Sequence, residues 1–274
     1  MKAWLRILIS FFVLFVVFSF HSCKKDSEDI ENPIVAGDST LTEKLIAASL
    51  EGKVIPHRIN AKVQLIEIQK MGFRAWELDL VFYSSSTGGY FLVQHDADST
   101  FSFTLHDYLS TTDMDKVIKL WFDVKNIGES NINEVLNHLN HLDSIFDISR
   151  RVILESKIKS AQFEVFRNYN WHTSYYIPYE QIEDWIESHD TIAQYNYGQI
   201  LSTQLIMQDI AAVSFDVTCY SFVKKYLEPY ISYNIVYHSW DMTLSLKEKD
   251  FIRNYFEKDY SNDQRVKTVI IPYY

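Results

Sequence analysis

The sequence has little cysteine, proline or glycine, with 2, 5 and 7 copies in 274 residues, and it has no long run of Lys or Arg. A broad nucleic-acid surface depends on clustered basic side chains, so a net charge of -10 argues against a nucleic-acid partner. A small anionic ligand stays possible, because charge at contact outweighs distant charge that salt screens.

Apolar residues, in contrast, are abundant. Hydrophobic residues make up 47% of the chain and aromatic residues 15%, which is enough to bury a full core. A length of 274 residues suits one large domain or two small ones. One domain is the simpler interpretation, and we assign residues 41–274 to it.

The first residues have the layout of a signal peptide. Lys2 and Arg6 precede an apolar run at 7–20, and Cys23 follows directly. This run is short for a spanning helix, which needs about 20 apolar residues, although an uncleaved signal anchor is the alternative. We expect a signal peptide at 1–22 and a charged tether at 23–40.

Cys23 resembles the acylated cysteine of bacterial lipoproteins, although Phe20 stands where that pattern usually has Leu. The resemblance implies an exported protein that a lipid on Cys23 anchors to a membrane of the cell envelope. Cys219 is the only other cysteine, so a lipidated Cys23 leaves no intrachain disulfide.

Short runs rich in Val, Ile, Phe and Tyr alternate with amphipathic stretches, as in repeated strand-helix units. Nine strands are expected, at 53–57, 75–82, 90–94, 117–124, 152–155, 174–177, 212–216, 235–238 and 266–271. The turn-rich segment 83–89 makes the second and third a hairpin, which leaves eight for a TIM (β/α)8 barrel of the α/β class. Helices are expected at 133–146, 179–188, 197–209, 221–230 and 245–256. The helix that usually follows the last strand is absent or is supplied by residues 41–50.

Acidic residues occur inside two of these apolar strands. Glu77 and Asp79 are two residues apart, so both point to the barrel interior, and Asp123 repeats the arrangement with Lys125 two residues on. Buried carboxylates repel one another, and one divalent cation, Mg²⁺ or Ca²⁺, would relieve the repulsion. The alternative is an internal salt-bridge cluster.

Two histidines stand at strand ends beside these acids. His57 closes the first strand and His95 follows the hairpin. In a TIM barrel the active site lies at the carboxyl ends of the strands. Imidazoles suit proton transfer near neutral pH, and a phosphodiester reaction needs one group to take a proton and one to give it.

Four motifs follow one another in order: His-Arg-x-Asn at 57–60, Glu-x-Asp at 77–79, His-Asp at 95–96 and Asp-x-Lys at 123–125. Together they resemble the glycerophosphodiester phosphodiesterase superfamily of phospholipase-C-like barrels. The resemblance implies that His57 and His95 are the acid and base. It implies Glu77 and Asp79 as metal ligands, with Asp123 as the third.

Asp-x-Lys, and the short segment between the last two motifs, look more like the sphingomyelinase D-type and menorin-type branches. Arg58 and Lys125 are placed to contact phosphate oxygens, and Trp240 resembles an aromatic residue at the mouth of related barrels. Trp171, His172, Tyr175 and His238 are further candidates for that rim.

The leading hypothesis is a metal-dependent phosphodiesterase that acts on a glycerophosphodiester or phospholipid head group. Either water or a substrate hydroxyl would attack the phosphorus. The rival is a non-catalytic envelope barrel that binds a ligand or a protein. Glycoside hydrolysis fits less well, because Glu77 and Asp79 share one strand instead of flanking a cleft. The oligomeric state is not indicated.

Overall fold

The computed structural model describes residues 52–86, 88–95, 103–156, 161–208, 210–248 and 250–273. The predictions for the signal peptide at 1–22, for Cys23 and its tether at 23–40, and for segment 41–50 all lie outside the described residues. No described helix combines the length and the apolar character that a membrane span requires.

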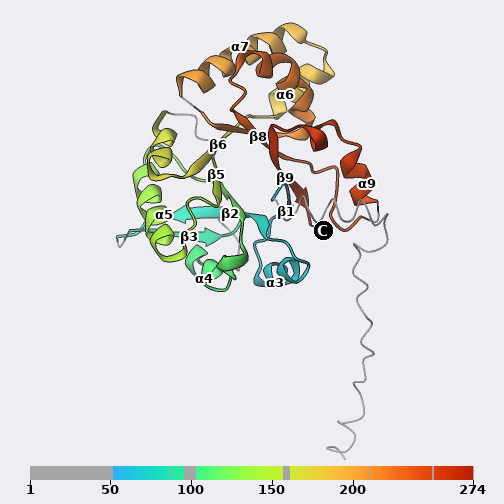
Figure 1. Cartoon of the computed structure of the whole chain (residues 1–274). Helices are drawn as coiled ribbons and strands as arrows, with labels where there is room; N and C mark the ends of the chain where they lie inside the picture. Colours follow the sequence, from blue (N-terminus) through green and yellow to red (C-terminus); the bar gives the residue numbers. More distant parts are fainter. Residues whose placement is uncertain are drawn as a thin grey trace, which may run out of the picture. The chain divides into compact units, whose positions relative to one another are not determined.

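One sheet holds all the named strands, and Figure 1 shows them at the centre with the helices around them. The strands are β1 (Val54–His57), β2 (Ala75–Tyr83), β3 (Tyr90–Val93), β4 (Lys119–Val124), β5 (Val152–Ser156), β6 (His172–Tyr176), β7 (Ala212–Asp216), β8 (Val236–Trp240) and β9 (Val266–Pro272). Their order is β1-β9-β8-β7-β6-β5-β4-β2-β3.

Every pairing in this sheet is parallel except that of β2 with β3, which is antiparallel. The strand beyond the eight that a barrel needs is therefore β3, the hairpin partner of β2 that the turn-rich segment predicts. Beyond β1, the Ile59 N–H donates to the carbonyl oxygen of Glu77 on β2 at 3.0 Å, which links the two ends of the parallel series. The prediction of a TIM-type α/β barrel is confirmed.

The connections between strands contain helices of very different length. They are α3 (Lys62–Lys70), α4 (Leu105–Ser110), α5 (Ile132–Phe146), α6 (Glu180–Glu187), α7 (Thr191–Met207), α8 (Tyr220–Phe222) and α9 (Phe251–Phe256). Shorter or irregular turns are η2 (Met114–Lys116), η3 (Ala161–Tyr169), η4 (Val217–Cys219), η5 (Val223–Leu227), η6 (Glu228–Tyr230) and η7 (Asp259–Asn262).

Several predicted helix bounds are wrong. Helix α7 begins six residues before the predicted 197, because the Asp190 carboxylate accepts a hydrogen bond from the Ala193 N–H and caps the helix. The predicted helix 221–230 is present, but as consecutive α-, π- and 3-10-helical segments, and only the second half of 245–256 is helical. Helix α3 escapes prediction because Val63 and Ile66 are exposed, so its apolar residues do not mark one buried face.

Alternation along β2 separates two environments. Trp76, Leu78 and Leu80 belong to the large core between strands and helices. Ala75 belongs to a small inner core with Ile55, Trp121, Ile153 and Ile270. Residues of the same parity as Ala75 face inward, so Glu77 and Asp79 lie in the barrel above an apolar layer.

Candidate active site

The carboxyl ends of β2, β4 and β5 bring three acids into one row. In the parallel register Asp79 is paired with Asp123, and Asp123 is paired with Glu155. Because paired residues of parallel strands project to the same face, all three side chains point to the barrel interior at one level. Glu77 lies one inward position earlier on β2.

Glu77, Asp79 and Asp123 can each offer one carboxylate oxygen such that all three oxygens lie within 4.8 Å of one another. Backbone and amide donors fix two of these acids. The Arg58 N–H donates to Glu77 Oε2 at 2.6 Å, and Asn60 Nδ2 donates to Asp79 Oδ2 at 2.7 Å. Asn60 Oδ1 also accepts from the Asp79 N–H at 3.0 Å, so one amide holds both ends of Asp79.

Two cationic side chains contact this group, Lys125 closely and Arg58 at longer range, with its Nε 3.6 Å from Asp79 Oδ2. Lys125 Nζ lies 2.5 Å from Asp79 Oδ1 and also donates to Asp123 Oδ2. Burial alone would lower the pKa of Lys125, but Asp123 and Asp79 outweigh it and raise that pKa above the ordinary value. Burial would likewise raise the pKa of Asp79, yet Lys125 and Asn60 hold it below its ordinary value.

Lys125 and Arg58 together do not balance three carboxylates. Burial, with repulsion from Asp79 and Asp123, raises the pKa of Glu77 well above its ordinary value. The pKa of Asp123 is also raised by burial, although Lys125 opposes the rise. Closely spaced oxygen donors with excess negative charge suit a hard divalent cation, so Glu77, Asp79 and Asp123 form a possible metal site.

Two histidines approach the acids from β1 and from the end of the hairpin. His57 Nε2 lies 3.7 Å from Glu77 Oε2, and burial, followed by the charge of Arg58, lowers the pKa of His57 to about 4. His57 is therefore neutral near pH 7. Arg58, at φ 55°, places its Nη2 2.7 Å from His95 Nε2. A guanidinium only donates, so this nitrogen of His95 is the acceptor and carries no proton.

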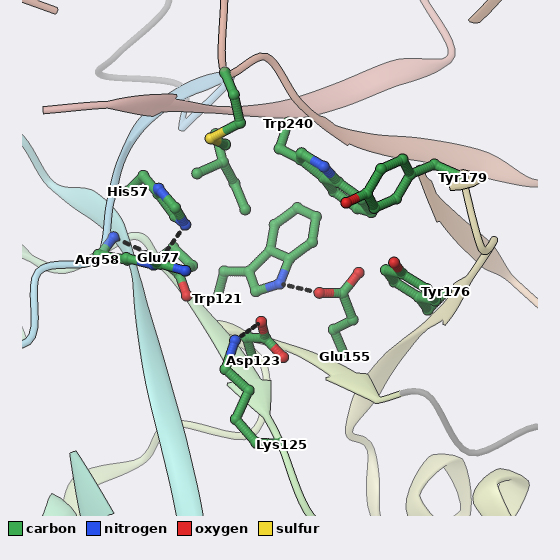
Figure 2. Close-up of a pocket in the computed structure, with 12 residues that line it drawn as sticks. His57, Arg58, Glu77, Trp121, Asp123, Lys125, Glu155, Tyr176, Tyr179 and Trp240 are labelled. Atoms are coloured by element: carbon green, nitrogen blue, oxygen red, sulfur yellow. Dashed lines mark hydrogen bonds and ion pairs between the residues drawn. The ribbon is translucent and has the colours of Figure 1, made fainter. Parts of the chain in front are cut away.

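A pocket of about 240 Å³ opens above the acids. Figure 2 shows His57, Arg58 and Glu77 on one side and Glu155, Tyr176, Tyr179 and Trp240 on the other, with Trp121 between them. The lining residues are His57, Arg58, Glu77, Trp121, Asp123, Lys125, Glu155, Tyr176, Tyr179, Trp240, Met242 and Ile270. His95 is not among them and reaches the pocket through Arg58.

Part of the predicted rim is wrong. Trp171 is buried against Asn140, Tyr175 bonds Gln204, and His238 is buried beside Ser174 inside the barrel. None of these lines the pocket, and His172 does not either. Alternation on β6 places Tyr176 in the pocket instead of its neighbour Tyr175.

Trp121, Glu155, Tyr176 and Tyr179 are lining residues that sequence reasoning missed. Glu155 could have been found from the sequence, because it is an acid at the carboxyl end of an apolar strand. Trp121 Nε1 donates to its Oε2 at 3.2 Å. Burial, followed by the charge of Asp123, raises the pKa of Glu155 to about 8, with the Ser214 hydroxyl and Trp121 opposing this rise.

No protein-family model matches the chain, and no curated protein matches its sequence. Solved structures do share the fold. One is a glycerophosphodiester phosphodiesterase from Parabacteroides distasonis, with 14% identity, a TM-score of 0.53, and coverage of 80% of this chain and 92% of that one.

Two further neighbours are candidate glycerophosphoryl diester phosphodiesterases. The protein from Silicibacter pomeroyi has 13% identity and a TM-score of 0.55, with coverage of 83% of this chain and 94% of that one. The protein from Agrobacterium tumefaciens has 10% identity and a TM-score of 0.56, with coverage of 80% and 92%. At these identities the likeness establishes the TIM-barrel fold, as predicted.

Proposed function

We propose that the protein is a metal-dependent phosphodiesterase that acts on a glycerophosphodiester or phospholipid head group at the cell envelope. One observation carries the proposal. His57 lines the pocket beside three clustered carboxylates, and His95, from a second strand end, contacts Arg58 of the same pocket. The fold shared with glycerophosphodiester phosphodiesterases supports the same reaction class.

The two histidines divide the proton transfers. His57 is neutral, so its Nε2 can take the proton of an attacking water. The water oxygen bonds to phosphorus, the bond from phosphorus to the leaving alcohol breaks, and His95 gives that oxygen a proton. Once Arg58 leaves His95 Nε2, that nitrogen takes up a proton from solvent before the reaction, and this is the proton it gives to the leaving alcohol.

Arg58 and Lys125 bind the phosphate. Arg58 lines the pocket, and the anionic diester offers its guanidinium a stronger acceptor than neutral His95 Nε2, so substrate binding would free that nitrogen. Lys125 lines the pocket between the acids. A divalent cation held by Glu77, Asp79 and Asp123 would stabilise negative charge on the phosphoryl oxygens.

The direct test is turnover by the full chain of a panel of glycerophosphodiesters and lysophospholipids with Mg²⁺ or Ca²⁺, followed by ³¹P NMR. We expect a phosphomonoester product and a loss of about 10²- to 10⁴-fold in His57→Ala and in His95→Ala. His141→Ala, on the exposed side of α5, is the matched control. Wild-type turnover no greater than that of the two histidine variants across the panel would refute the proposal.

A second candidate is a non-catalytic barrel in which the acids form a structural cluster. The contacts of Lys125 with Asp79 and Asp123 favour it, because they neutralise part of the charge without a metal. Calorimetry with Mg²⁺ and Ca²⁺ separates the two. A catalytic site binds one ion and loses it in Glu77→Gln, whereas a structural cluster binds none.

A further inference from the structure

Glu155 is a buried carboxyl group in the pocket that the proton transfers and the metal site do not use. Its side chain is 5% exposed, and Trp121 Nε1 fixes its orientation by donating to Oε2. The other oxygen, Oε1, is enclosed and makes no hydrogen bond of normal geometry with a described residue; the buried Ser214 hydroxyl beside Glu155 is likewise without a partner. A buried acceptor without a partner is unfavourable by about 1–3 kcal/mol, so it marks a place for a ligand donor.

An aromatic wall stands beside Glu155. The rings of Tyr176 and Trp240 are stacked, with centroids 5.5 Å apart and planes 5° apart, and Tyr179 continues the lining. Aromatic faces attract cations. Figure 2 shows this wall across the pocket from His57 and Arg58.

Charge is divided across the pocket. Of the basic side chains that line it, His57 and Arg58 lie with Glu77 across the pocket from Glu155, and Lys125 lies with Asp123. On the Glu155 side the described lining residues are aromatic or apolar, and none is basic. An anion at one end and a cation at the other would complement this division.

We infer that the pocket takes a zwitterionic phosphodiester whose alcohol carries a protonated primary amine, and that Glu155 Oε1 is the acceptor for that ammonium. This inference rests on the proposed function and names its substrate class. A hydroxyl would satisfy the hydrogen bond but would not favour the ionised form of Glu155, whose pKa burial and Asp123 raise to about 8. A trimethylammonium group would supply the charge but no N–H donor. A primary ammonium supplies both.

The first experiment compares kcat/KM of the full chain with Mg²⁺ for glycerophosphoethanolamine, glycerophosphocholine and glycerophosphoglycerol. We expect the ethanolamine diester to be preferred by at least about tenfold, as one charged hydrogen bond predicts. In Glu155→Gln this preference should fall by about ten- to a hundredfold. Glu164→Gln removes another carboxylate with a buried oxygen, outside the pocket, and should keep the preference.

A binding measurement separates this inference from the proposed function. Phosphoethanolamine and propyl phosphate have nearly the same shape and differ in the ammonium. Calorimetry should show phosphoethanolamine bound at least about tenfold more tightly by the wild-type chain, with the difference lost in Glu155→Gln. If this difference holds without turnover of any diester, the phosphodiesterase proposal fails and the ammonium site stands.

Equal binding of the two monophosphates by the wild-type chain would overturn the inference, even if diesters are hydrolysed. A preference for the choline or the glycerol diester would overturn it too. The wild-type comparison decides the matter even if Glu155→Gln does not fold.

Discussion

Lys125 contacts Asp79 and Asp123 at the point where a divalent cation would bind. Its ammonium offsets part of the repulsion among the carboxylates when no ion is bound. Lys125 does not contact Glu77. The side chain nearest to the Glu77 carboxylate as an ion-pair partner is His57, which is neutral near pH 7. Lys125 thus stabilises the fold and keeps the acids in place for an ion.

Asn60 provides the residue-scale prediction. Its side chain donates to the Asp79 carboxylate and accepts from the Asp79 backbone N–H, so Asn60→Ala removes one hydrogen bond from each. We expect the free energy of unfolding to fall by about 1–3 kcal/mol and the affinity for Mg²⁺ to fall about ten- to a hundredfold. Urea unfolding and calorimetry measure these, with exposed Asn196→Ala as the control. Unchanged affinity for Mg²⁺ would show that Asn60 does not orient a ligand.

At the scale of elements, the strands were predictable and much of the helical layer was not. Strand β2 is a nearly continuous apolar run interrupted by Glu77 and Asp79, and both the strand and its inward acids follow from sequence alone. The predicted helix 221–230 contains the π-helical segment η5, which packs against α7. The conformation of such a segment depends on its packing against distant parts of the chain, which local sequence periodicity cannot predict.

The candidate site divides in the same way. His57, Glu77, Asp79 and Asp123 could be found because they lie at fixed spacings in or beside recognisable strands. Glu155 could not be placed beside Asp123 without the register between β4 and β5, which depends on the closed sheet. Sequence analysis assigned Tyr175 to the pocket rim in place of Tyr176. Neighbouring residues of a strand face opposite sides of the sheet, so an error of one residue exchanges the two faces.

Gly198 provides the prediction at the scale of elements. Gly→Ala usually stabilises a helix interior by about 1 kcal/mol. In α7, however, a Cβ at residue 198 would lie 2.2 Å from the carbonyl oxygen of Tyr226 in η5. We expect Gly198→Ala to destabilise the protein by about 1–3 kcal/mol in urea unfolding. Exposed Thr203→Ala on the same helix is the control, and a stabilising Gly198→Ala would mean that α7 and η5 are not closely packed.

At the scale of the whole molecule, a closed barrel that buries titratable groups has two opposed pH dependences. Burial lowers the pKa of His172 and His238, so their protonation in the unfolded chain destabilises the fold below pH about 6.5. Burial and Asp123 raise the pKa of Glu155 to about 8. Its contribution to stability is full below its unfolded pKa of about 4.3 and is lost as the pH rises through about 8.

Two substitutions should therefore change the pH dependence in opposite directions. His172→Gln removes a group that destabilises the fold in acid, so stability should fall less than in the wild type between pH 6.5 and 5. Glu155→Gln removes a contribution that is lost toward alkaline pH, so its stability relative to the wild type should rise from pH 5 to 8. Each slope should change by up to about 1.4 kcal/mol per pH unit. Urea unfolding in the presence of a chelator measures both, and slopes parallel to the wild type would mean that neither group titrates differently on folding.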